Sequence, residues 1–336
     1  MSASASLVEK GRTTTCTTGA VASEGCDSNR YRSAAYLRTL GELSRLARSR
    51  TVPILIEGES GTGKTVLARW LHEHSPRAQC AFHDVNLGAL DDGLAGSELF
   101  GHVPGAFTDA RHARAGRFAS ANGGTLFLDE IGKAAWSVQR KLLLVVETGE
   151  MRPIGSDRTV RVDVRIVAAS NRPLAALVSE GGFLPDLYAR LEVFRVSLPA
   201  LRERRADIWP LVDDALQKHH GACGYARAPV VSDELMSALK QAPWPNNLRQ
   251  LDATIHRVLI DAERAQTLDL CHCVGALSYL RHLGGAQPTT STAIVEAIAL
   301  HGSVSMAAKA LGVDRGTLYR RQRRGAEEPR SSEHQG

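Results

Sequence analysis

The chain has 336 residues, 43% of them hydrophobic and 23% charged, with a formal net charge of +5. This composition supports ordinary hydrophobic cores in two or three soluble domains. The sequence contains no run of about 18 apolar residues, which excludes a membrane-spanning helix and argues against a membrane partner. Six cysteines are scattered along the chain, which favours reduced thiols in the cytoplasm over a disulfide framework. The Cys-His-Cys run at 271–273 matches no common zinc spacing, so incidental residues are favoured there over a metal site.

The first half of the chain alternates apolar strand segments with helical segments. Residues 1–33 are rich in Ser and Thr, so we expect a flexible leader there and not a signal peptide. Residues 34–49 carry apolar positions at helical spacing. Apolar segments then predict short buried strands within 52–58, 123–131 and 162–171. This alternation predicts an α/β domain with a parallel sheet over residues 34–198.

The second half has a different pattern, because the strand signal gives way to helical periodicity. We expect a helical subdomain over 199–280, a linker rich in Gly, Pro and Thr over 281–292, a further helical segment over 293–325 and a flexible tail over 326–336. Residues 301–324 hold six basic side chains and one acidic one, and six minus one leaves a charge of +5. Such a local excess suits a polyanion, although a solvated basic tail has the same composition.

The segment GESGTGKT fits the phosphate-loop pattern G-x-x-x-x-G-K-[ST] and lies between a predicted strand and a predicted helix. Its glycines let backbone N–H groups surround phosphate oxygens at the positive end of the following helix. Lys64 would reach the β- and γ-phosphates of ATP, and the Thr65 hydroxyl would bind Mg²⁺. The predicted nucleotide-binding residues are Gly58, Glu59, Ser60, Gly61, Thr62, Gly63, Lys64 and Thr65.

The segment TLFLDE supplies the acidic half of the same site. An apolar strand places Asp129 at the carboxyl edge of the sheet, where its carboxylate can hold Mg²⁺ through water. Glu130 follows it as the candidate general base for the attacking water. Asn171 closes another predicted strand and could orient that water, although an Asn after a strand is usually a turn residue.

In their order and spacing, these motifs resemble the sigma-54-dependent transcriptional activators, which are bacterial enhancer-binding proteins of the AAA+ class. The matching segments lie between about residues 34 and 324 and read GESGTGKT, SELFGHVPGAFTDA, GGTLFLDEIG, DVRIVAASN, DLYARLEVFRVSLPALRERRADI and WPNNLRQL. The resemblance implies an AAA+ phosphate-loop α/β domain with a helical lid, followed by an all-α Fis-type helix-turn-helix. It also implies an ATP-hydrolysing ring, typically a hexamer, that binds enhancer DNA and remodels sigma-54 RNA polymerase into an open complex.

The segment GAFTDA is similar to the family's GAFTGA loop, which transmits ATP-driven movement to sigma-54. A small apolar tip suits contact with a protein better than contact with a nucleotide. The resemblance therefore assigns the sigma-54 contact, centred on Phe107 and Thr108, to Gly105, Ala106, Phe107, Thr108, Asp109 and Ala110. A Gly-rich surface turn is the plain alternative.

Three more residues receive their roles from the resemblance alone. Asn86 matches the asparagine that holds the catalytic glutamate in check until the nucleotide state changes. Arg249 matches the lid arginine that contacts the γ-phosphate and counts among the nucleotide-binding residues, while Arg190 matches an arginine at the subunit interface. Taken singly, the two arginines would be read as surface ion pairs, which contribute little.

The C-terminal segment predicts helices joined by a tight turn at Gly312, with Asp314 as the cap of the last helix. This pattern resembles the Fis-type domain that places such activators on enhancers. The candidate DNA-binding residues, which would face bases or phosphates in the major groove, are Arg315, Thr317, Tyr319 and Arg320.

The chain departs from the family pattern in three ways. Asp109 replaces the second glycine of the loop, at a cost of about 1 kcal/mol if that position needs a positive φ. Leu184 stands where the family usually has an arginine that acts across the subunit interface. We also expect no receiver or ligand-sensing domain before residue 34, so control would come from a partner, from expression level or from the leader.

These departures leave other functions open. The chain could be a DNA-binding regulator whose ATPase is weak and which lacks remodelling activity of its own. It could also form a co-dependent hetero-oligomer in which a related co-activator supplies the missing arginine. Alternatively, Arg190 or one of the arginines in LRERR (Arg202, Arg204 or Arg205) could take over the role of that arginine. A general AAA+ loader or helicase is less favoured, because it would not need the loop at 105–110.

Overall fold

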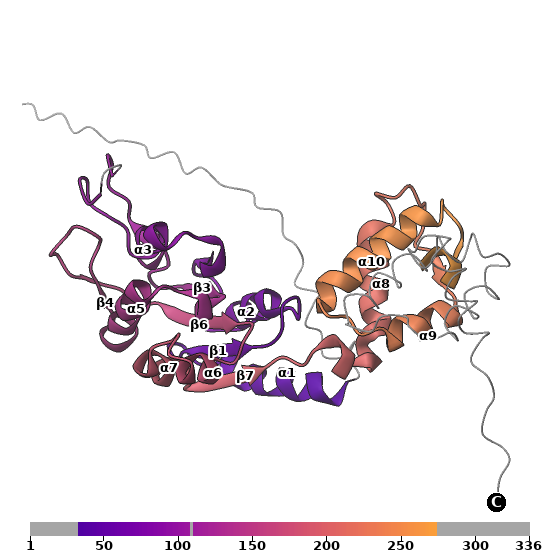
Figure 1. Cartoon of the computed structure of the whole chain (residues 1–336), viewed down its shortest axis with the longest axis horizontal. Coiled ribbons are helices and arrows are strands. Elements are labelled where there is room, and N and C mark those ends of the chain that lie inside the picture. Colours follow the sequence, from indigo (N-terminus) through magenta and orange to yellow (C-terminus); the bar gives the residue numbers. More distant parts are fainter. Residues whose placement is uncertain (1–32, 108–109, 274–336) are drawn as a thin grey trace, which may run out of the picture.

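A five-stranded parallel sheet forms the framework of the first half of the molecule (Figure 1). The computed structural model describes residues 33–107 and 110–273. The strands are β1 (Ile54–Glu57), β2 (Phe82–Asn86), β3 (Thr125–Asp129), β6 (Arg165–Ser170) and β7 (Phe194–Ser197). Their order in the sheet is β2-β3-β6-β1-β7. The parallel sheet expected from the sequence is confirmed, and this order brings the carboxyl ends of β3, β6 and β1 together at one edge.

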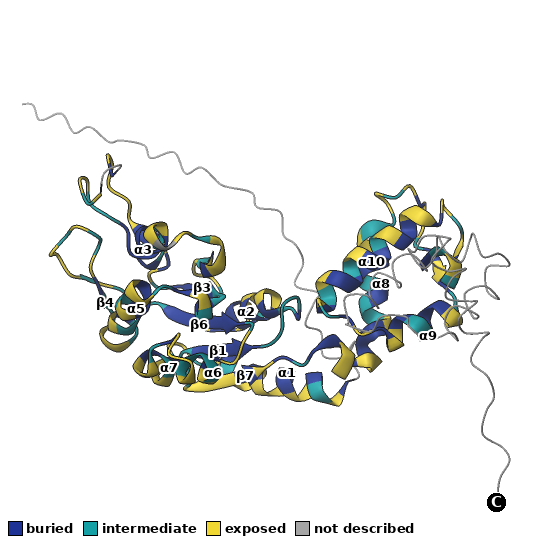
Figure 2. Ribbon diagram, viewed as in Figure 1, coloured by how far each residue is buried: buried dark blue, intermediate teal, exposed yellow. Residues whose placement is uncertain are grey.

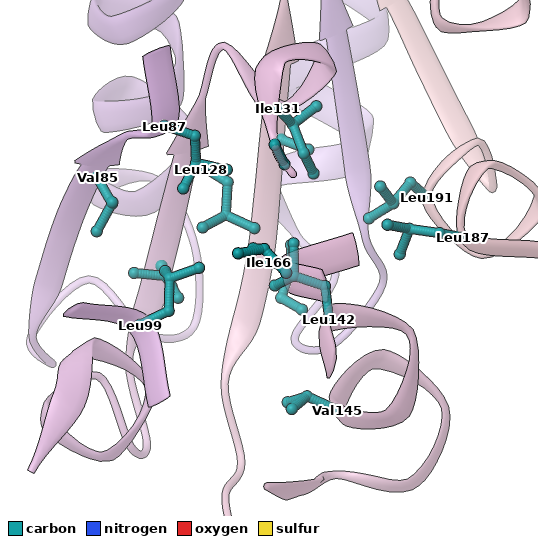
Figure 3. Close-up of a cluster of buried hydrophobic side chains, with 14 of the residues drawn as sticks. Val85, Leu87, Leu99, Leu128, Ile131, Leu142, Val145, Ile166, Leu187 and Leu191 are labelled. Atoms are coloured by element: carbon teal, nitrogen blue, oxygen red, sulfur yellow. The ribbon is translucent and has the colours of Figure 1, made fainter. Parts of the chain in front are cut away.

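Helices cover both faces of the sheet. On one face lie α1 (Ala34–Ala47) and α2 (Lys64–Glu73). The other face is covered by α3 (Asp92–Phe100), α4 (Gly116–Ser120), α5 (Trp136–Thr148), α6 (Leu174–Ser179) and α7 (Pro185–Leu191). Figure 3 shows part of this second layer, in which Leu99, Leu142 and Leu187 face the sheet.

Both faces of the central strands are buried, so consecutive residues in these strands are apolar. In β3, Leu126 and Leu128 belong to the core under α3–α7, whereas Phe127 between them belongs to the core under α1 and α2. In β6, Ile166 and Val167 divide in the same way. Strands of this kind have continuous apolar sequences instead of alternating ones. β1 and β6 are buried throughout, and β3 is buried up to Asp129 at its end (Figure 2).

A helical subdomain follows β7. Two short 3₁₀ turns, Leu201–Glu203 and Arg205–Asp207, lead into α8 (Ile208–His219), α9 (Asp233–Gln241) and α10 (Asn247–Asp261). The three helices share their own apolar core, in which Trp244 is fully buried and its indole N–H donates to the Leu239 carbonyl at 2.8 Å. The expected helical lid is confirmed. It also contains two strands of two residues each, β8 (Val230–Val231) and β9 (Thr267–Leu268), which are too short to leave a pattern in the sequence.

A small hairpin also escaped the sequence analysis. It consists of β4 (Glu150–Met151) and β5 (Val160–Arg161), which pair antiparallel and enclose the turn at 152–159. This hairpin lies between α5 and β6 in the chain, and Gly155 in its turn lies against Ala106 of the loop at 105–110.

Several expectations concern residues outside the described ranges. These include residues 1–32 of the leader, Thr108, Asp109, the linker at 281–292, the tail, and the DNA-binding candidates Arg315, Thr317, Tyr319 and Arg320. Within residues 33–107 and 110–273, no helix has the length and apolar character needed to cross a bilayer. The same residues contain no cluster of three His, Cys, Asp or Glu side chains placed to hold a metal, and their cysteines Cys80, Cys223, Cys271 and Cys273 are free.

Candidate nucleotide site and protein-contact loop

The phosphate loop leaves β1 and leads directly into α2. The buried Lys64 side chain folds back into the loop, where its ammonium donates to the carbonyl oxygens of Gly58 at 2.7 Å and Glu59 at 2.9 Å. Burial lowers the pKa of Lys64, and the charges of Asp129 and Glu130 oppose this effect. The Lys64 ammonium therefore lies within the loop, and the expected magnesium ligand Asp129 and the expected general base Glu130 are close enough to act on its pKa.

Asp129 and Glu130 follow one another at the carboxyl end of β3 but differ in their surroundings. Asp129 Oδ1 accepts the backbone N–H of Glu130 at 2.9 Å. Burial raises the pKa of Asp129, while this N–H and the Lys64 ammonium act to lower it. Glu130 has a left-handed backbone with a φ of 54°, which turns the chain sharply away from the strand. The charge of Glu130 nevertheless acts on Asp129 and adds to the rise in its pKa.

The Glu130 carboxylate is held by contacts at one oxygen. Its Oε2 forms an ion pair with the Lys133 ammonium. This oxygen is buried, yet it accepts no hydrogen bond from any residue that the structure describes. Gly88 lies directly against it, because a Cβ on Gly88 would stand 2.3 Å from Oε2. Glu130 therefore carries its charge between Lys133 and Gly88, and its role as the general base stays a prediction.

Asn86 lies beside these acidic residues without bonding to the glutamate. It ends β2 directly opposite Asp129 in the sheet register. Its side-chain oxygen accepts the backbone N–H of Gly88 at 2.9 Å, and the hydrogen bonds within the described ranges include none between Asn86 and Glu130. Asn86 thus reaches the surroundings of Glu130 through Gly88, and its expected restraint on the glutamate stays a prediction.

Two further candidates approach this edge from other elements. Asn171 is half-buried and directly follows β6, the strand between β1 and β3. Arg249 comes from α10 of the lid, and its Nη1 donates to the Ser60 hydroxyl of the phosphate loop at 3.3 Å. Burial is the main cause of the lowered pKa of Lys64, and the positive charge of Arg249 lowers that pKa further. Arg249 thus contacts the phosphate loop through Ser60, Asn171 follows the strand beside β1, and the roles of both stay predictions.

The two positions expected at a subunit interface lie on and before α7. Arg190 is exposed and pairs with Glu147 of α5, with 3.1 Å between Nε and Oε1. Leu184 directly precedes the helix and packs, half-buried, against the core under α3–α7. Its backbone N–H donates to the buried Gln139 side chain at 2.8 Å. The main chain at residue 184 is thus fixed by a contact that does not depend on its side chain.

The arginines of LRERR have partners within the chain. Arg202 forms a two-pronged ion pair with Glu59, at 2.6 and 2.8 Å. Arg204 is buried, with its guanidinium 3.9 Å from the centre of the Tyr36 ring. Arg202 and Arg205 are both exposed, and Arg205 Nε donates to the Arg202 carbonyl at 3.3 Å. Of these arginines, Arg205 is therefore the one best placed to act on a neighbouring subunit.

The segment expected to contact sigma-54 lies between α3 and α4, where Gly105 and Phe107 are exposed but Ala110, also expected to make the contact, is buried. Its ends are joined by a hydrogen bond from the Gly105 N–H to the Ala110 carbonyl at 2.8 Å. Phe107 is 40% exposed and stands edge-on to the His102 ring, with 4.9 Å between the ring centres. His102 Nδ1 in turn lies 2.7 Å from the hydroxyl of the buried Ser97. An aromatic side chain is thereby supported at the tip and remains open to a partner.

The base of this loop is joined to the β4–β5 hairpin. The Val103 N–H donates to the Ile154 carbonyl at 3.1 Å, and the Ile154 N–H donates to the Gly101 carbonyl at 2.9 Å. Gly155 has a φ of 77°, and a Cβ there would stand 2.7 Å from the Ala106 Cβ. Both segments project from the end of the α/β domain away from α8 and α10 (Figure 1). The loop and the hairpin therefore form one projecting unit.

Sequence reasoning missed the role of Asn247 and the partner of Glu59. Asn247 is buried and donates to the Ser60 carbonyl at 2.9 Å and to Glu59 Oε2 at 3.2 Å. Glu59 also binds Arg202, as described above. The one available signal was the Asn-Asn pair in WPNNLRQL, because Asn is enriched where a turn needs a left-handed residue.

The donor groups of the site fit a magnesium nucleotide. Thr65 follows Lys64 at the N-terminus of α2, and its side chain is exposed. The Asp129 carboxylate lies close enough to Lys64 for their charges to interact. Mg²⁺ prefers such oxygen ligands, usually one or two from the protein together with phosphate oxygens and water. Thr65 and Asp129 would hold the ion, and the phosphate loop would hold the phosphates.

Two family models match the chain. The model of the sigma-54 interaction domain matches residues 30–197. The model of the AAA+ ATPase lid domain matches residues 202–278. The two matches thus meet near the end of β7, where the sheet gives way to the helical subdomain.

Known relatives share the same region. The anaerobic nitric oxide reductase transcription regulator NorR of Klebsiella pneumoniae (strain 342) is 44% identical over 237 residues, which are 70% of this chain and 46% of that protein. The DNA-binding transcriptional regulator NtrC of Escherichia coli (strain K12) is 46% identical over 226 residues, 67% of this chain and 48% of NtrC. The chain thus matches about half the length of these relatives.

A solved structure resembles the molecule over most of its length. NtrX from Brucella abortus in complex with ATP superimposes with a TM-score of 0.66 at 28% identity, covering 88% of this chain and 68% of NtrX. A second structure of NtrX, determined in complex with ADP, gives the same values.

Proposed function

Since the chain belongs to the family of sigma-54 interaction domains and carries an AAA+ lid domain, we propose that it is a sigma-54-dependent transcriptional activator that hydrolyses ATP to remodel sigma-54 RNA polymerase into an open complex. One observation carries this proposal. The phosphate loop with Lys64 and an exposed loop with Phe107 at its tip are parts of one α/β domain. Such a domain can convert a change at the nucleotide into a change at a protein contact. A protein that acts on promoter DNA in this way would work in the bacterial cytoplasm.

The site residues divide the chemistry among them. Lys64 and the loop N–H groups would neutralise and orient the phosphates. Glu130 would accept the proton of the attacking water, and Asn171 would orient that water. Mg²⁺, held by Thr65 and Asp129, supplies positive charge to the phosphate oxygens when it is bound. Arg249 would report the state of the γ-phosphate to the lid, since it already lies over Ser60.

We further propose a ring of subunits, a hexamer in the typical case, because an interface arginine acts only on a neighbour's site. Arg190 supports this, since its exposed side chain is held at the surface through Glu147. The neighbour would be a second copy of the chain or a related co-activator. The basic C-terminal segment would place the ring on upstream enhancer DNA.

A second function is favoured by the environment of Leu184. Its side chain packs against the apolar core and carries no charge that could stabilise a phosphoryl group. The chain would then be a DNA-binding, ATP-binding regulator with weak or partner-dependent ATPase activity. A co-activator that carries an arginine at the matching position would restore hydrolysis.

Thr108→Ala tests the sigma-54 contact. We expect the variant to keep the nucleotide turnover of the wild type but to lose binding to sigma-54 in the presence of ADP–aluminium fluoride. It should also fail to open a premelted promoter with sigma-54 RNA polymerase and ATP. Thr267→Ala, at an exposed position in β9 of the lid, is the matched control and should behave as wild type. Unchanged sigma-54 binding by Thr108→Ala, with a lower melting temperature, would reduce the loop to a folding element.

Deleting residues 293–336 tests DNA binding. The truncated chain should bind nucleotide normally but lose affinity for DNA fragments selected by the full chain, because the segment 301–324 with its charge of +5 is removed. Mobility shifts over a series of salt concentrations measure this. Deleting only 326–336 should leave DNA binding intact. Equal affinity and equal salt dependence in both deletions would place the DNA contacts elsewhere in the chain.

A further inference from the structure

The phosphate loop and the lid are joined at three consecutive loop residues. Asn247 of the lid donates from its side-chain Nδ2 to the Ser60 carbonyl at 2.9 Å and to Glu59 Oε2 at 3.2 Å. The neighbouring Leu248 donates its backbone N–H to the Gly61 carbonyl at 2.9 Å. These residues lie almost 190 positions apart in the sequence, so the contacts fix one domain against the other.

Asn247 has the features of a built junction and not of a chance contact. Its side chain is 0% exposed, and its backbone has a φ of 50°. Asparagine tolerates this left-handed region better than most residues with a side chain. Its Oδ1 accepts the backbone N–H of Leu201 at 2.7 Å. Both amide hydrogens and the oxygen therefore have partners, so the buried group is fully satisfied.

Close backbone contact reinforces the same junction. Gly61 has a φ of 78°, and a Cβ there would stand 2.2 Å from the carbonyl oxygen of Asn246. Only glycine lets the loop and the turn before α10 approach so closely. Since packed backbone segments cannot pass through one another, a shift of the loop must displace the turn.

Asn247 also connects the loop to the segment that leads into the lid. Leu201, its third partner, begins the 3₁₀ turn between β7 and α8. Arg202 in that turn forms the two-pronged ion pair with Glu59, which lowers the pKa of the glutamate. Glu59 therefore receives contacts from two parts of the helical subdomain, Arg202 in the turn before α8 and Asn247 at the start of α10.

We propose that Asn247 is a positioning residue that couples the phosphate loop to the lid, so that nucleotide binding reorients α10 and carries Arg249 with it. This inference rests on the proposed function, because it takes ATP as the ligand of the loop. Lys64 donates to the carbonyl of Glu59, and a bound phosphate competes for the same ammonium. The carbonyl released by this competition is adjacent to Ser60, whose own carbonyl Asn247 holds. Asn247 acts through these loop residues and does not touch the nucleotide.

Hydrogen–deuterium exchange on the full chain, with and without Mg·ATPγS, tests the coupling in α10. Asn247→Gly keeps the left-handed backbone and removes every side-chain bond. Asn247→Asp keeps the side-chain volume and the acceptor for Leu201 but loses both donors to the loop. Asn246→Ala is the matched control, since that neighbour is exposed and its side chain does not cap the helix. In the wild type and in Asn246→Ala, nucleotide should change the exchange of α10. Both Asn247 variants should bind nucleotide and lose this change.

The outcomes separate the inference from the proposed function. A wild type that binds no nucleotide contradicts the proposed function, and the coupling with it. A wild type that binds nucleotide without any response in α10 contradicts the coupling alone. An Asn247 variant that is merely less stable, with a lower melting temperature but the full nucleotide response in α10, also overturns the coupling. Both variants remove the donors to Glu59 and Ser60. If one variant folds poorly, the other one alone therefore tests the coupling between the phosphate loop and α10.

Discussion

Glu130→Gln should slow single-turnover ATP hydrolysis by about 10²- to 10⁴-fold while leaving ATP affinity nearly unchanged. The carboxamide has the size of the carboxylate, so it fits against Gly88, but it cannot take a proton from water. Losing the ion pair with Lys133 should matter little to stability, because the lysine is more than half exposed. Lys64 and Asp129, which are unchanged in this variant, should still hold the magnesium nucleotide. Rapid-quench hydrolysis and titration calorimetry measure the two quantities separately.

Glu180→Gln is the matched control for this substitution. Glu180 is an exposed carboxylate on the same domain that pairs with Arg172, so its neutralisation should change neither binding nor hydrolysis. If Glu130→Gln hydrolyses ATP at the rate of this control, then another group is the general base. Equal losses of binding and hydrolysis would instead show that Glu130 holds the nucleotide in place.

Leu184→Arg should raise ATP turnover without a matching gain in ATP affinity. Arginines positioned at phosphoryl-transfer sites contribute about 10³- to 10⁵-fold to rate, because they neutralise charge that develops only in the transition state. The position accepts the change, since its main chain is held by Gln139 and its side chain is half-buried at the surface of the core. A long arginine can lay its stem on that core and keep its charged group in water.

Steady-state hydrolysis over a range of protein concentrations distinguishes the explanations. Leu184→Gln, which adds length and polarity but no charge, should leave turnover at the wild-type level. A co-activator with an arginine at this position should raise turnover on mixing with the wild type. If the wild type alone hydrolyses ATP rapidly and Leu184→Arg does not increase the rate, then Arg190 or Arg205 already acts as the interface arginine. Leu184 would then have no effect on turnover.

The sequence revealed the central strands of the sheet and hid the outer ones. β1, β3 and β6 are buried on both faces, so their apolar runs stand out. β2 and β7 lie at the two edges, where a strand needs few buried side chains. Val85 is the one buried residue of β2, and Val196 is the one buried residue of β7. With so little apolar sequence, neither strand could be recognised without its neighbours.

The candidate site was predictable where its residues follow one another and hidden where they do not. Lys64, Asp129 and Glu130 belong to short motifs whose order alone implies their chemistry. The contact between Asn247 and Glu59 joins positions far apart in the chain, and each looks like an ordinary polar member of its own motif. Such a contact depends on how the lid packs against the sheet, which no local pattern specifies.

The tight packing of Gly155 on Ala106 has a consequence for how this protein changes over generations. A side chain at 155 would meet the loop, since even a Cβ on Gly155 would stand 2.7 Å from that of Ala106. The two positions lie in separate segments of the gene, yet substitutions at them should not be selected independently. Residues other than glycine at 155 should therefore be inherited only together with compensating changes in the loop. Genetic suppressors of defects in the loop should map to the hairpin, a segment that carries no recognisable motif.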